Sequence, residues 1–591
     1  MHSQFRLRTL IDLFHQTVGR VEMLEKVCLE IVRTEREETL TFSQLKTRAE
    51  HFASWLIHAA DIKIKDKVAV LGKNRIDWDV ALWGIILAGA VPVLIDPERL
   101  VEGVKNHLLH TDSRLVVVAD DYQDADARCD LKEFAIGRGL GFVEMTDVPI
   151  ASSCVVRDAF PRLRSGQACE NEIRNTQYAV RNTNFEIQSD DTAIILCTSG
   201  TTGDPREVEL THTNLIANIA GSVEKVRITD KDRLGHILPP HHSFGLTVGK
   251  FLPFCAGAAN IYTNKYRQIS ELMRDKGITI FVAVPALYTV LAKSIEEGLA
   301  KQKQKNRLVS FLDRCMPKLV GKSVVRKLGW NKLRFFLSGS APVPRWVLDV
   351  FWTRGLLLYE GYGTTENSPV YGFNDSPGGL GSVGKPISTL SVQVVDENSR
   401  TLLPGERGEI CLGGPCIMKG YYKNPRATEA VIRIDDKGVR WLHTGDLGYL
   451  DEDGNLFITG RKKYLIVLPG GKKVNPEMVE TALSQARFVK EVLVVPGYDV
   501  DSAGIVQEAI KAIVQPDWEN IEAHTNLSYA DLVEQPQALK TLIWQSINQC
   551  QRNSRQLSHF ERVSSQHLEI RIDEFQKTST GKIRREAYMK V

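Results

Sequence analysis

Short apolar runs alternate with longer segments of helical character in the N-terminal part of the chain. β-branched and other apolar residues fill positions 68–71, 91–95 and 115–118, and a helical pattern covers 78–87 between the first two runs. Strands that alternate with helices are typical of βαβ units, in which parallel strands form a sheet covered by helices. The alternation therefore predicts an α/β fold with mixed or parallel sheets.

The chain is too long to form one hydrophobic core. With 591 residues, 43% of them apolar and 25% charged, it has the composition of a globular protein with at least two domains. The pattern becomes β-rich from residue 391, and a smaller α+β pattern follows Lys463. We expect a large N-terminal domain, residues 1–461, that includes a β-rich subdomain, and a small mobile α+β domain, residues 462–591.

Charge and hydropathy limit the classes of partner. A formal net charge of +3 gives no support for nucleic-acid binding. No apolar stretch is long enough to span a bilayer, and the N-terminus lacks a signal-peptide core, so we expect a cytoplasmic protein. The basic run from Lys301 to Arg307 indicates a solvated helix face, with peripheral contact to an anionic membrane surface as the alternative.

The cysteines suggest a reducing environment. They show neither a CxxC pair nor another spacing typical of metal ligands, and Cys28, Cys197 and Cys411 lie inside apolar runs. Buried, reduced thiols are the simplest interpretation, and no structural metal is expected.

A loop rich in hydroxyl groups and glycine follows a buried strand expected at residues 192–197. Its residues are Thr198, Ser199, Gly200, Thr201, Thr202 and Gly203. Glycine lets the backbone approach an anion closely and turn its N–H groups toward it. The spacing does not match a Walker A loop. We interpret the segment as a phosphate-binding loop, and an ordinary surface turn remains the alternative.

Three later groups of residues follow this loop in a fixed order. They are Glu360-Gly361-Tyr362-Gly363-Thr364-Thr365-Glu366, then Trp441-Leu442-His443-Thr444-Gly445-Asp446 with Thr459-Gly460-Arg461, and finally Lys577-Thr578-Ser579-Thr580-Gly581-Lys582. With the loop, they resemble the adenylate-forming superfamily of acyl-CoA synthetases, luciferases and nonribosomal peptide adenylation domains. The resemblance covers nearly the whole chain, and the helical, basic stretch at 285–329 is similar to the long-chain fatty acyl-CoA synthetase branch.

The resemblance implies an enzyme that activates a long- or medium-chain fatty acid with ATP. The acid would become an acyl-adenylate and then pass to the thiol of CoA, with release of pyrophosphate and AMP. Fatty acid, ATP and CoA are the expected partners, and Mg²⁺ is the expected cofactor. The same residues would serve an acyl carrier protein ligase or an enzyme that stops at the acyl-adenylate. A degenerate nucleotide-binding protein is a further alternative.

The resemblance also implies residue roles. The loop would wrap the β- and γ-phosphates, Thr365 would contact the α-phosphate, and Glu366 would hold Mg²⁺. Lys582 would be the catalytic cation that neutralises charge on the carboxylate and the α-phosphate. The remaining implied nucleotide-binding residues are Ser340, Ala341, Pro342, Glu360, Gly361, Tyr362, Asp446 and Arg461. Among these, Tyr362 would lie on the adenine and Asp446 would accept hydrogen bonds from the ribose.

Each of these residue types also has an ordinary structural role. Glu366 fits the start of a helix, and Asp446 fits a turn. A lysine near a C-terminus, such as Lys582, is usually solvated. His242 matches the family's histidine at the carboxylate end of the acyl pocket, and a packed or turn histidine is an equally good interpretation.

The chain departs from the family pattern at several positions. Arg206 and Glu207 stand where Lys-Gly is usual, which keeps a cation but adds a negative charge. Other departures are Tyr464, which follows the hinge position Lys463, and Met478, Phe575 and Gln576. The glycine pair Gly470-Gly471 fits a passage for a pantetheine arm, and a plain turn explains it equally well. These changes bear on rate, hinge and acceptor more than on the class of reaction.

Overall fold

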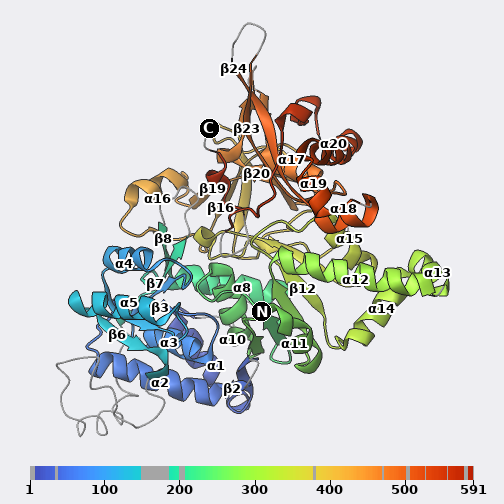
Figure 1. Ribbon diagram of the computed structural model, residues 1–591. Coiled ribbons are helices and arrows are strands. Elements are labelled where there is room, and N and C mark those ends of the chain that lie inside the picture. The colour runs from blue at the N-terminus through green and yellow to red at the C-terminus, as the bar shows by residue number, and fades with distance from the viewer. Residues whose placement is uncertain are drawn as a thin grey trace. The chain divides into compact units, whose positions relative to one another are not determined.

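The computed structural model describes residues 7–32, 37–147, 186–198, 206–305, 307–376, 381–468, 472–500, 506–525, 527–554, 557–577 and 583–589. The chain forms two compact units (Figure 1). The first contains Met1–Val392 and Leu412–His443, and the second contains Gln393–Cys411 and Thr444–Val591. The boundary expected between residues 461 and 462 stays a prediction. Within the described residues, no helix is both long and apolar enough to cross a membrane.

The first unit contains a seven-stranded sheet with the order β17-β8-β7-β4-β3-β5-β6. Its strands are β3 (Lys67–Leu71), β4 (Val91–Ile95), β5 (Ser113–Val118), β6 (Gly141–Glu144), β7 (Thr192–Thr198), β8 (Arg206–Thr211) and β17 (Gly420–Tyr421). The strands from β7 to β6 are parallel, whereas β8 and β17 run antiparallel to their neighbours. The three apolar runs that predicted βαβ units are β3, β4 and β5, so this prediction is confirmed.

Helices cover both faces of this sheet. The alternate residues Ala69, Leu71 and Val93 share a core with α4 (Val101–His110) and α5 (Ala125–Gly137). Figure 1 shows these two helices beside the strands. The helix α3 (Ile76–Leu87) packs against β3 and β4 and is buried almost completely, which explains its continuous apolar sequence. The long N-terminal helix α2 (Phe42–His58) packs against α3 and begins at a capping box formed by Thr41 and Gln44.

A second sheet of the same unit has eight strands in the order β14-β13-β12-β11-β9-β10-β1-β2. Its strands are β1 (Val27–Ile31), β2 (Glu38–Thr41), β9 (Arg233–His236), β10 (Ala259–Tyr262), β11 (Ile280–Ala283), β12 (Phe335–Ser338), β13 (Leu358–Tyr362) and β14 (Gly372–Phe373). The strands from β1 to β13 are parallel, and β2 and β14 close the two edges in antiparallel orientation.

Both faces of the second sheet are buried. Phe336 points into one core, and its neighbours Phe335 and Leu337 point into another, as expected for a strand covered on both sides. The helices of the unit are α1 (Leu10–Val18), α8 (His212–Val226), α9 (Ser243–Leu246), the π-helix η3 (Thr247–Phe251), α10 (Leu252–Ala256), α11 (Ile269–Asp275), α12 (Pro285–Lys305), α13 (Arg307–Cys315), α14 (Pro317–Leu328), α15 (Arg345–Thr353) and α16 (Pro425–Val431). The helical pattern expected at 285–329 is confirmed as α12, α13 and α14.

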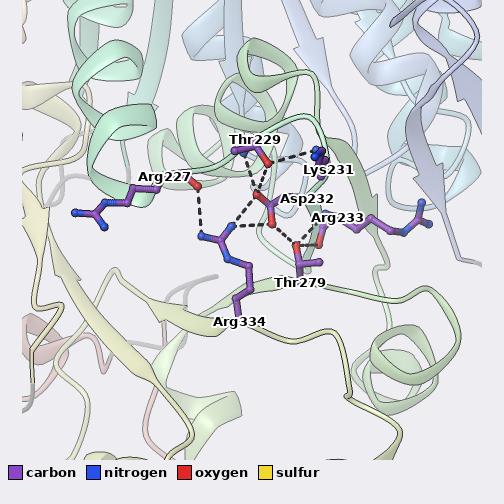
Figure 2. Close-up of polar contacts among 7 residues, drawn as sticks. All are labelled: Arg227, Thr229, Lys231, Asp232, Arg233, Thr279 and Arg334. Atoms are coloured by element: carbon purple, nitrogen blue, oxygen red, sulfur yellow. Dashed lines mark hydrogen bonds and ion pairs between the residues drawn. The ribbon is translucent and has the colours of Figure 1, made fainter. Parts of the chain in front are cut away.

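One carboxylate ties together the amino ends of three adjacent parallel strands (Figure 2). Asp232, just before β9, accepts hydrogen bonds from Thr279, just before β11, and from Arg334, just before β12. Burial raises the pKa of Asp232, but the hydrogen bonds from Arg334, Thr279 and the backbone of Thr229 outweigh it and hold this pKa below its usual value. This network fixes the sheet at the edge opposite to the carboxyl ends of its strands.

The second unit is the smaller one and is rich in strands. A five-stranded sheet with the order β15-β16-β19-β18, to which β20 adds beside β19, contains the points at which the chain passes between the units. Its strands are β15 (Ser391–Val395), β16 (Gly408–Gly413), β18 (Ile432–Ile434), β19 (Arg440–Leu450) and β20 (Leu456–Arg461), of which β18 belongs to the residues of the first unit. The β-rich pattern expected from residue 391 onward is therefore confirmed.

The C-terminal part of this unit has the expected α+β composition. Its strands and helices are β21 (Ile466–Leu468), β22 (Lys472–Val474), α17 (Pro476–Leu483), β23 (Val489–Val500), β24 (Val506–Pro516), α18 (Trp518–Thr525), α19 (Tyr529–Val533), α20 (Pro536–Asn553) and β25 (Leu568–Ile570). The long antiparallel pair β23 and β24, orange in Figure 1, packs with α17 and α20 around Val494, Val479 and Ile543.

Candidate functional site

Three loops that carry predicted site residues follow parallel strands of the eight-stranded sheet, two of which, β12 and β13, are adjacent, while β11 separates β12 from β9. The loop with His242 follows β9, the loop with Ser340 follows β12, and the loop with Thr365 and Glu366 follows β13. In a parallel sheet the carboxyl ends of the strands share one edge, which is where α/β proteins form their ligand sites. The register pairs Ser338 with Glu360, so the second and third loops start side by side.

Glu360 anchors the end of the loop that follows β12. Its carboxylate is buried and accepts a hydrogen bond of 2.8 Å from the backbone N–H of Val343, directly after Pro342. Burial raises the pKa of Glu360 to about 7. This places Ser340, Ala341 and Pro342 on a loop anchored at its far end, so Glu360 acts on the candidate nucleotide site through the backbone.

Close packing connects the loop of His242 to the loop of Ser340. The ring of Phe244, two residues after His242, lies against Gly339, where a Cβ atom would stand 2.8 Å from the ring. A larger residue at Gly339 would push the two loops apart. Ser340 itself adopts a φ of 73°, a left-handed conformation that side chains rarely adopt.

Tyr362 ends β13 with its ring partly exposed. It lies 5.7 Å from the ring of the fully buried Tyr371, at an angle of 59°. The next residue must be glycine, because a Cβ atom on Gly363 would stand 1.5 Å from the carbonyl oxygen of Pro369. Tyr362 is therefore followed by a position with no room for a side chain, and it is preceded by Gly361, where a Cβ atom would stand 3.3 Å from backbone oxygens.

A short 3₁₀ helix, η5 (Thr365–Asn367), presents Thr365 and Glu366. Thr364 and the buried Asn367 form a capping box at its start. The side-chain oxygen of Asn367 accepts a hydrogen bond of 2.6 Å from the backbone N–H of Thr364. Asn218 on α8 donates to the carbonyl oxygens of Asn367 and Val370 and so fixes the segment from the other side. The sequence analysis missed Asn218 and Asn367, although the spacing of Thr364 and Asn367 is that of a capping box.

A hydroxyl contact joins the loops of His242 and Thr365. The Oγ atom of Ser243 lies 3.1 Å from Oγ1 of Thr365. The half-buried His242 comes directly before Ser243, at the start of α9. The structure therefore brings the residue predicted to contact the α-phosphate next to the loop predicted to border the acyl pocket.

His241, adjacent to His242, is the buried member of the pair. The two ring centroids are 4.7 Å apart. Burial and, to a smaller extent, the nearby His242 lower the pKa of His241 to about 3, whereas Asp96 opposes the shift. His241 is therefore neutral at physiological pH. This leaves His242 as the residue of the pair that is accessible, and its role at the acyl pocket stays a prediction.

Glu366 is linked through Tyr421 to Arg206 at the start of β8, the strand that follows the hydroxyl-rich loop. Its Oε1 atom accepts a hydrogen bond of 2.9 Å from the hydroxyl of Tyr421 on β17. The guanidinium of Arg206, the first residue of β8, lies 5.0 Å from the ring centroid of the same tyrosine. Burial raises the pKa of Tyr421, and the charge of Glu366 raises it further, so this hydroxyl remains a donor. No sequence signal pointed to Tyr421.

The donors around Glu366 fit a magnesium ion. Mg²⁺ takes oxygen ligands, and protein sites often supply only one or two carboxylates, with substrate phosphates completing the shell. Glu366 is half-buried, and its Oε1 atom has a fixed partner in Tyr421, so the carboxylate is oriented before any ion arrives. The hydroxyl of the neighbouring Thr365 adds an oxygen on the same short helix.

In the second unit, Asp446 and Arg461 form an ion pair. They lie opposite each other on β19 and β20, with 2.8 Å between Nε of Arg461 and Oδ1 of Asp446. The carboxylate of Asp446 is 5% exposed, and the guanidinium is 35% exposed. Thr444 caps the turn by accepting the N–H of Asp446. The two residues predicted to bind the ribose are thus brought together.

The departures from the family pattern have local partners in this unit. Tyr464 donates to Glu586 at 2.8 Å, and Lys463 pairs with the same carboxylate at 3.3 Å. The sulfur of Met478 accepts a hydrogen bond of 3.9 Å from the guanidinium of Arg407. Tyr464 therefore replaces an acidic side chain at the expected hinge with a hydroxyl that binds an acidic partner.

The residues on both sides of the predicted catalytic lysine are anchored. Phe575 is buried against Tyr588, and the hydroxyl of Tyr588 accepts the N–H of Gln576. Lys577 and Ile583 form an antiparallel bridge. Lys582 itself, Ser199, Gly200, Thr201, Thr202, Gly203, the glycine pair Gly470-Gly471 and the side chain of Thr198 lie outside the described residues.

Comparison with known proteins identifies the family of the chain. Residues 17–422 match the AMP-binding enzyme family, and residues 463–591 match the AMP-binding enzyme C-terminal domain. A long-chain-fatty-acid–CoA ligase of Escherichia coli O157:H7 is 28% identical over 86% of each chain. A chloroplastic long-chain-fatty-acid–[acyl-carrier-protein] ligase of Arabidopsis thaliana is 27% identical, over 86% of this chain and 76% of its own.

Solved structures share the fold at lower identity. ATP-bound MatB from Rhodopseudomonas palustris superposes with a TM-score of 0.71 at 22% identity, over 98% of both chains. The o-succinylbenzoate CoA synthetase of Bacillus subtilis, in complex with ATP and magnesium, gives a TM-score of 0.69 at 21% identity, over 97% of this chain and 98% of its own. The predicted fold class, a large α/β part with a smaller α+β domain, is confirmed.

Proposed function

This chain belongs to the AMP-binding enzyme family and is an AMP-forming acid–thiol ligase, and we propose that its acid is a long- or medium-chain fatty acid and its thiol that of CoA. ATP and CoA are co-substrates of such ligases. The proposal for the acid rests on the long-chain relatives and on the helical stretch from α12 to α14, which resembles that branch.

The observation that carries the proposed chemistry is the contact between Ser243 and Thr365. It joins the loop that would border the acid to the helix that would contact the α-phosphate, at 3.1 Å between hydroxyl oxygens. The fatty carboxylate would attack the α-phosphate and expel pyrophosphate. The thiol would then attack the acyl carbon, and the C–O bond to AMP would break. Fixed donors aimed at the growing negative charge lower the first barrier.

We assign Tyr362 to the adenine and the loop of Ser340, Ala341 and Pro342 to its other side. Asp446, oriented by Arg461, would accept the ribose hydroxyls. Glu366 and the hydroxyl of Thr365 would hold Mg²⁺, which when bound neutralises phosphate charge. The hydroxyl-rich loop of residues 198–203 would bind the β- and γ-phosphates, and Lys582 would supply the mobile cation.

The test is product analysis with purified protein, ATP, Mg²⁺ and a series of acids from acetate to stearate. We expect AMP and pyrophosphate in equal amounts, with the highest rates for long or medium chains. Each acid is paired with CoA or with an acyl carrier protein, because one relative is named as a carrier-protein ligase. Release of ADP would contradict the adenylate mechanism, and a preference for acetate would contradict the fatty acid.

Replacing Glu366 by glutamine should weaken the use of Mg²⁺. The amide keeps an oxygen for the hydroxyl of Tyr421 but loses the charge that attracts the cation. We expect the Mg²⁺ concentration for half-maximal pyrophosphate exchange to rise by about tenfold or more, which corresponds to a lost interaction of about 1.4 kcal/mol or more. Excess Mg²⁺ should restore part of the rate.

The matched control for this variant is Glu224→Gln. Glu224 also accepts a hydroxyl, from Ser388 at 2.7 Å, but lies on α8 away from the candidate residues in the sequence. Its Mg²⁺ dependence should equal that of the unchanged protein. An unchanged dependence in Glu366→Gln as well would remove Glu366 from the metal site.

A further inference from the structure

Four side chains with metal-binding atoms meet on one face of the seven-stranded sheet. Cys197 on β7 and Glu207 on β8 are direct partners in the antiparallel register, so their side chains point to the same side. Helix α4 covers this face, and its residues Val104 and Leu108 belong to the same core as Cys197. His107 and His110 lie three residues apart on α4, one turn of helix, and face the strands together.

The distances join all four residues. Nδ1 of His107 lies 2.6 Å from Oε1 of Glu207, and Nδ1 of His110 lies 3.1 Å from Oε2 of the same carboxylate. Ligand atoms of His107, Cys197 and Glu207 all lie within 4.8 Å of one another. A cross-strand pair and a helical turn thus supply two donors each.

The site is buried on three sides and accessible on the fourth. His107, Cys197 and Glu207 are 2%, 8% and 6% exposed, whereas the side chain of His110 is 46% exposed. Both ion pairs of Glu207 within the described part of the chain are with histidines. Nε2 of His107 is buried and has no hydrogen-bond partner among the described residues. The carboxylate of Glu207 thus has only histidines as ion-pair partners among the described residues, and the ring nitrogen of His107 on the side away from Glu207 is unpartnered.

The chemical types of these four ligands indicate which metal ion the cluster would bind. One sulfur, two imidazoles and one carboxylate suit Zn²⁺, which binds Cys, His and Asp or Glu in tetrahedral sites. Mg²⁺ and Ca²⁺ prefer oxygen ligands only. We propose that His107, His110, Cys197 and Glu207 form a zinc site that joins β7, β8 and α4.

A tetrahedral site requires the donor atoms of the observed cluster to move. Ligand atoms 2.0–2.1 Å from zinc stand about 3.3 Å apart in a tetrahedron. The hydrogen bond between His107 and Glu207 would lengthen from 2.6 Å by under an ångström, and His110, which lies 3.1 Å from Glu207, would turn toward the group formed by His107, Cys197 and Glu207. On binding, a bond from Sγ of Cys197 to zinc replaces the S–H bond, and the proton passes to solvent along the exposed side of His110.

Glu207 is one of the residues that depart from the family pattern, and in the structure its carboxylate lies beside two histidines. The proposal assigns it a role as a zinc ligand together with them.

The experiment measures zinc on the full-length protein without an affinity tag and without nucleotide. We expect one zinc per chain by mass spectrometry of metals, after chelation and re-addition of Zn²⁺. Co²⁺ in its place should give a sulfur-to-cobalt charge-transfer band and the visible spectrum of a tetrahedral site. Cys197→Ser should abolish the charge-transfer band, and Glu207→Gln should weaken zinc binding by about tenfold or more.

Controls separate this site from other cysteines and from misfolding. Cys416 is also buried, and its sulfur contacts Thr389, so Cys416→Ser is the matched control and should leave the band unchanged. His110→Asn changes a side chain that is nearly half exposed, and it should weaken zinc binding while the circular dichroism spectrum stays the same.

Two outcomes would overturn the proposal. The first is that the unchanged protein binds no more zinc than the Cys197→Ser variant does. The cluster would then be a carboxylate paired with histidines and not a metal site. The second is equal zinc binding by unchanged protein, Cys197→Ser, Glu207→Gln and His110→Asn, which would place the metal elsewhere. Since no substrate is present, neither outcome depends on the proposed ligase reaction.

Discussion

Lys582→Ala should slow formation of the acyl-adenylate by roughly two to three orders of magnitude, the loss expected when one preorganised charge is removed from a transition state. The first half-reaction brings a carboxylate to a triphosphate, and the lysine is proposed to neutralise the charge where they meet. The rate is measured as acid-dependent exchange of labelled pyrophosphate into ATP. Transfer of the acyl group from supplied acyl-adenylate to CoA should change much less.

The comparison of the two half-reactions makes this prediction specific. Lys577→Ala is the matched control, because Lys577 lies five residues earlier and pairs with Glu491 at 2.9 Å. It should leave both rates nearly unchanged. Equal losses in both half-reactions of Lys582→Ala would contradict a cation needed only for adenylation, and an unchanged exchange rate would remove Lys582 from the site.

The sheets were predictable because their signal is local. The runs that became β3, β4 and β5 are apolar at every position, as required for strands covered on both faces. The order of the strands was not predictable in the same way. β1 pairs with β10, more than two hundred residues later, and no pattern within either strand identifies the other.

The candidate site shows the same difference between local and distant contacts. Asp446 and Arg461 lie on a hairpin, so their approach follows from fifteen residues of chain. Glu366 and Tyr421, or Ser243 and Thr365, meet across 55 and 122 residues through the packing of separate loops. The resemblance identified Glu366 and Thr365 by type and order, but it carried no information on the partners that orient them.

The proposed zinc site marks a further limit of sequence reasoning. A search for metal ligands by spacing found none, because the donors of this cluster come from residues 107, 110, 197 and 207 on three elements. Glu207 was recognised only as a departure from the family pattern. Its proximity to two histidines depends on how α4 lies across β7 and β8, which no local pattern specifies.

The sequence patterns also did not predict a buried ion pair within the first unit. Asp79 lies on α3, in a segment whose apolar pattern predicted a helix, and its side chain is 4% exposed. It accepts hydrogen bonds from Lys250 of the π-helix η3 at 2.9 Å and from Tyr262 of β10 at 2.8 Å. Burial raises the pKa of Asp79 and lowers that of Lys250, and the ion pair opposes both shifts.

Removing one member of this pair should destabilise the first unit severely. Asp79→Asn leaves the ammonium of Lys250, 3% exposed, without its counter-charge, which costs about 3–5 kcal/mol. Lys250→Met leaves a buried carboxylate and should cost a similar amount. The double variant removes both charges, and the methionine can fill the apolar space along the lysine chain, so we expect it to recover most of the loss.

Urea unfolding followed by tryptophan fluorescence measures these changes, because Trp78 lies beside Asp79 in α3 and is fully buried. Arg345→Met is the control, since Arg345 forms an exposed pair with Asp349 and such pairs contribute about 0–1 kcal/mol. A double variant as unstable as the sum of the two single variants would show that the charges do not stabilise each other. In that case the ring of Tyr262, whose centroid lies 3.7 Å from the ammonium of Lys250, would be the partner that stabilises this buried charge.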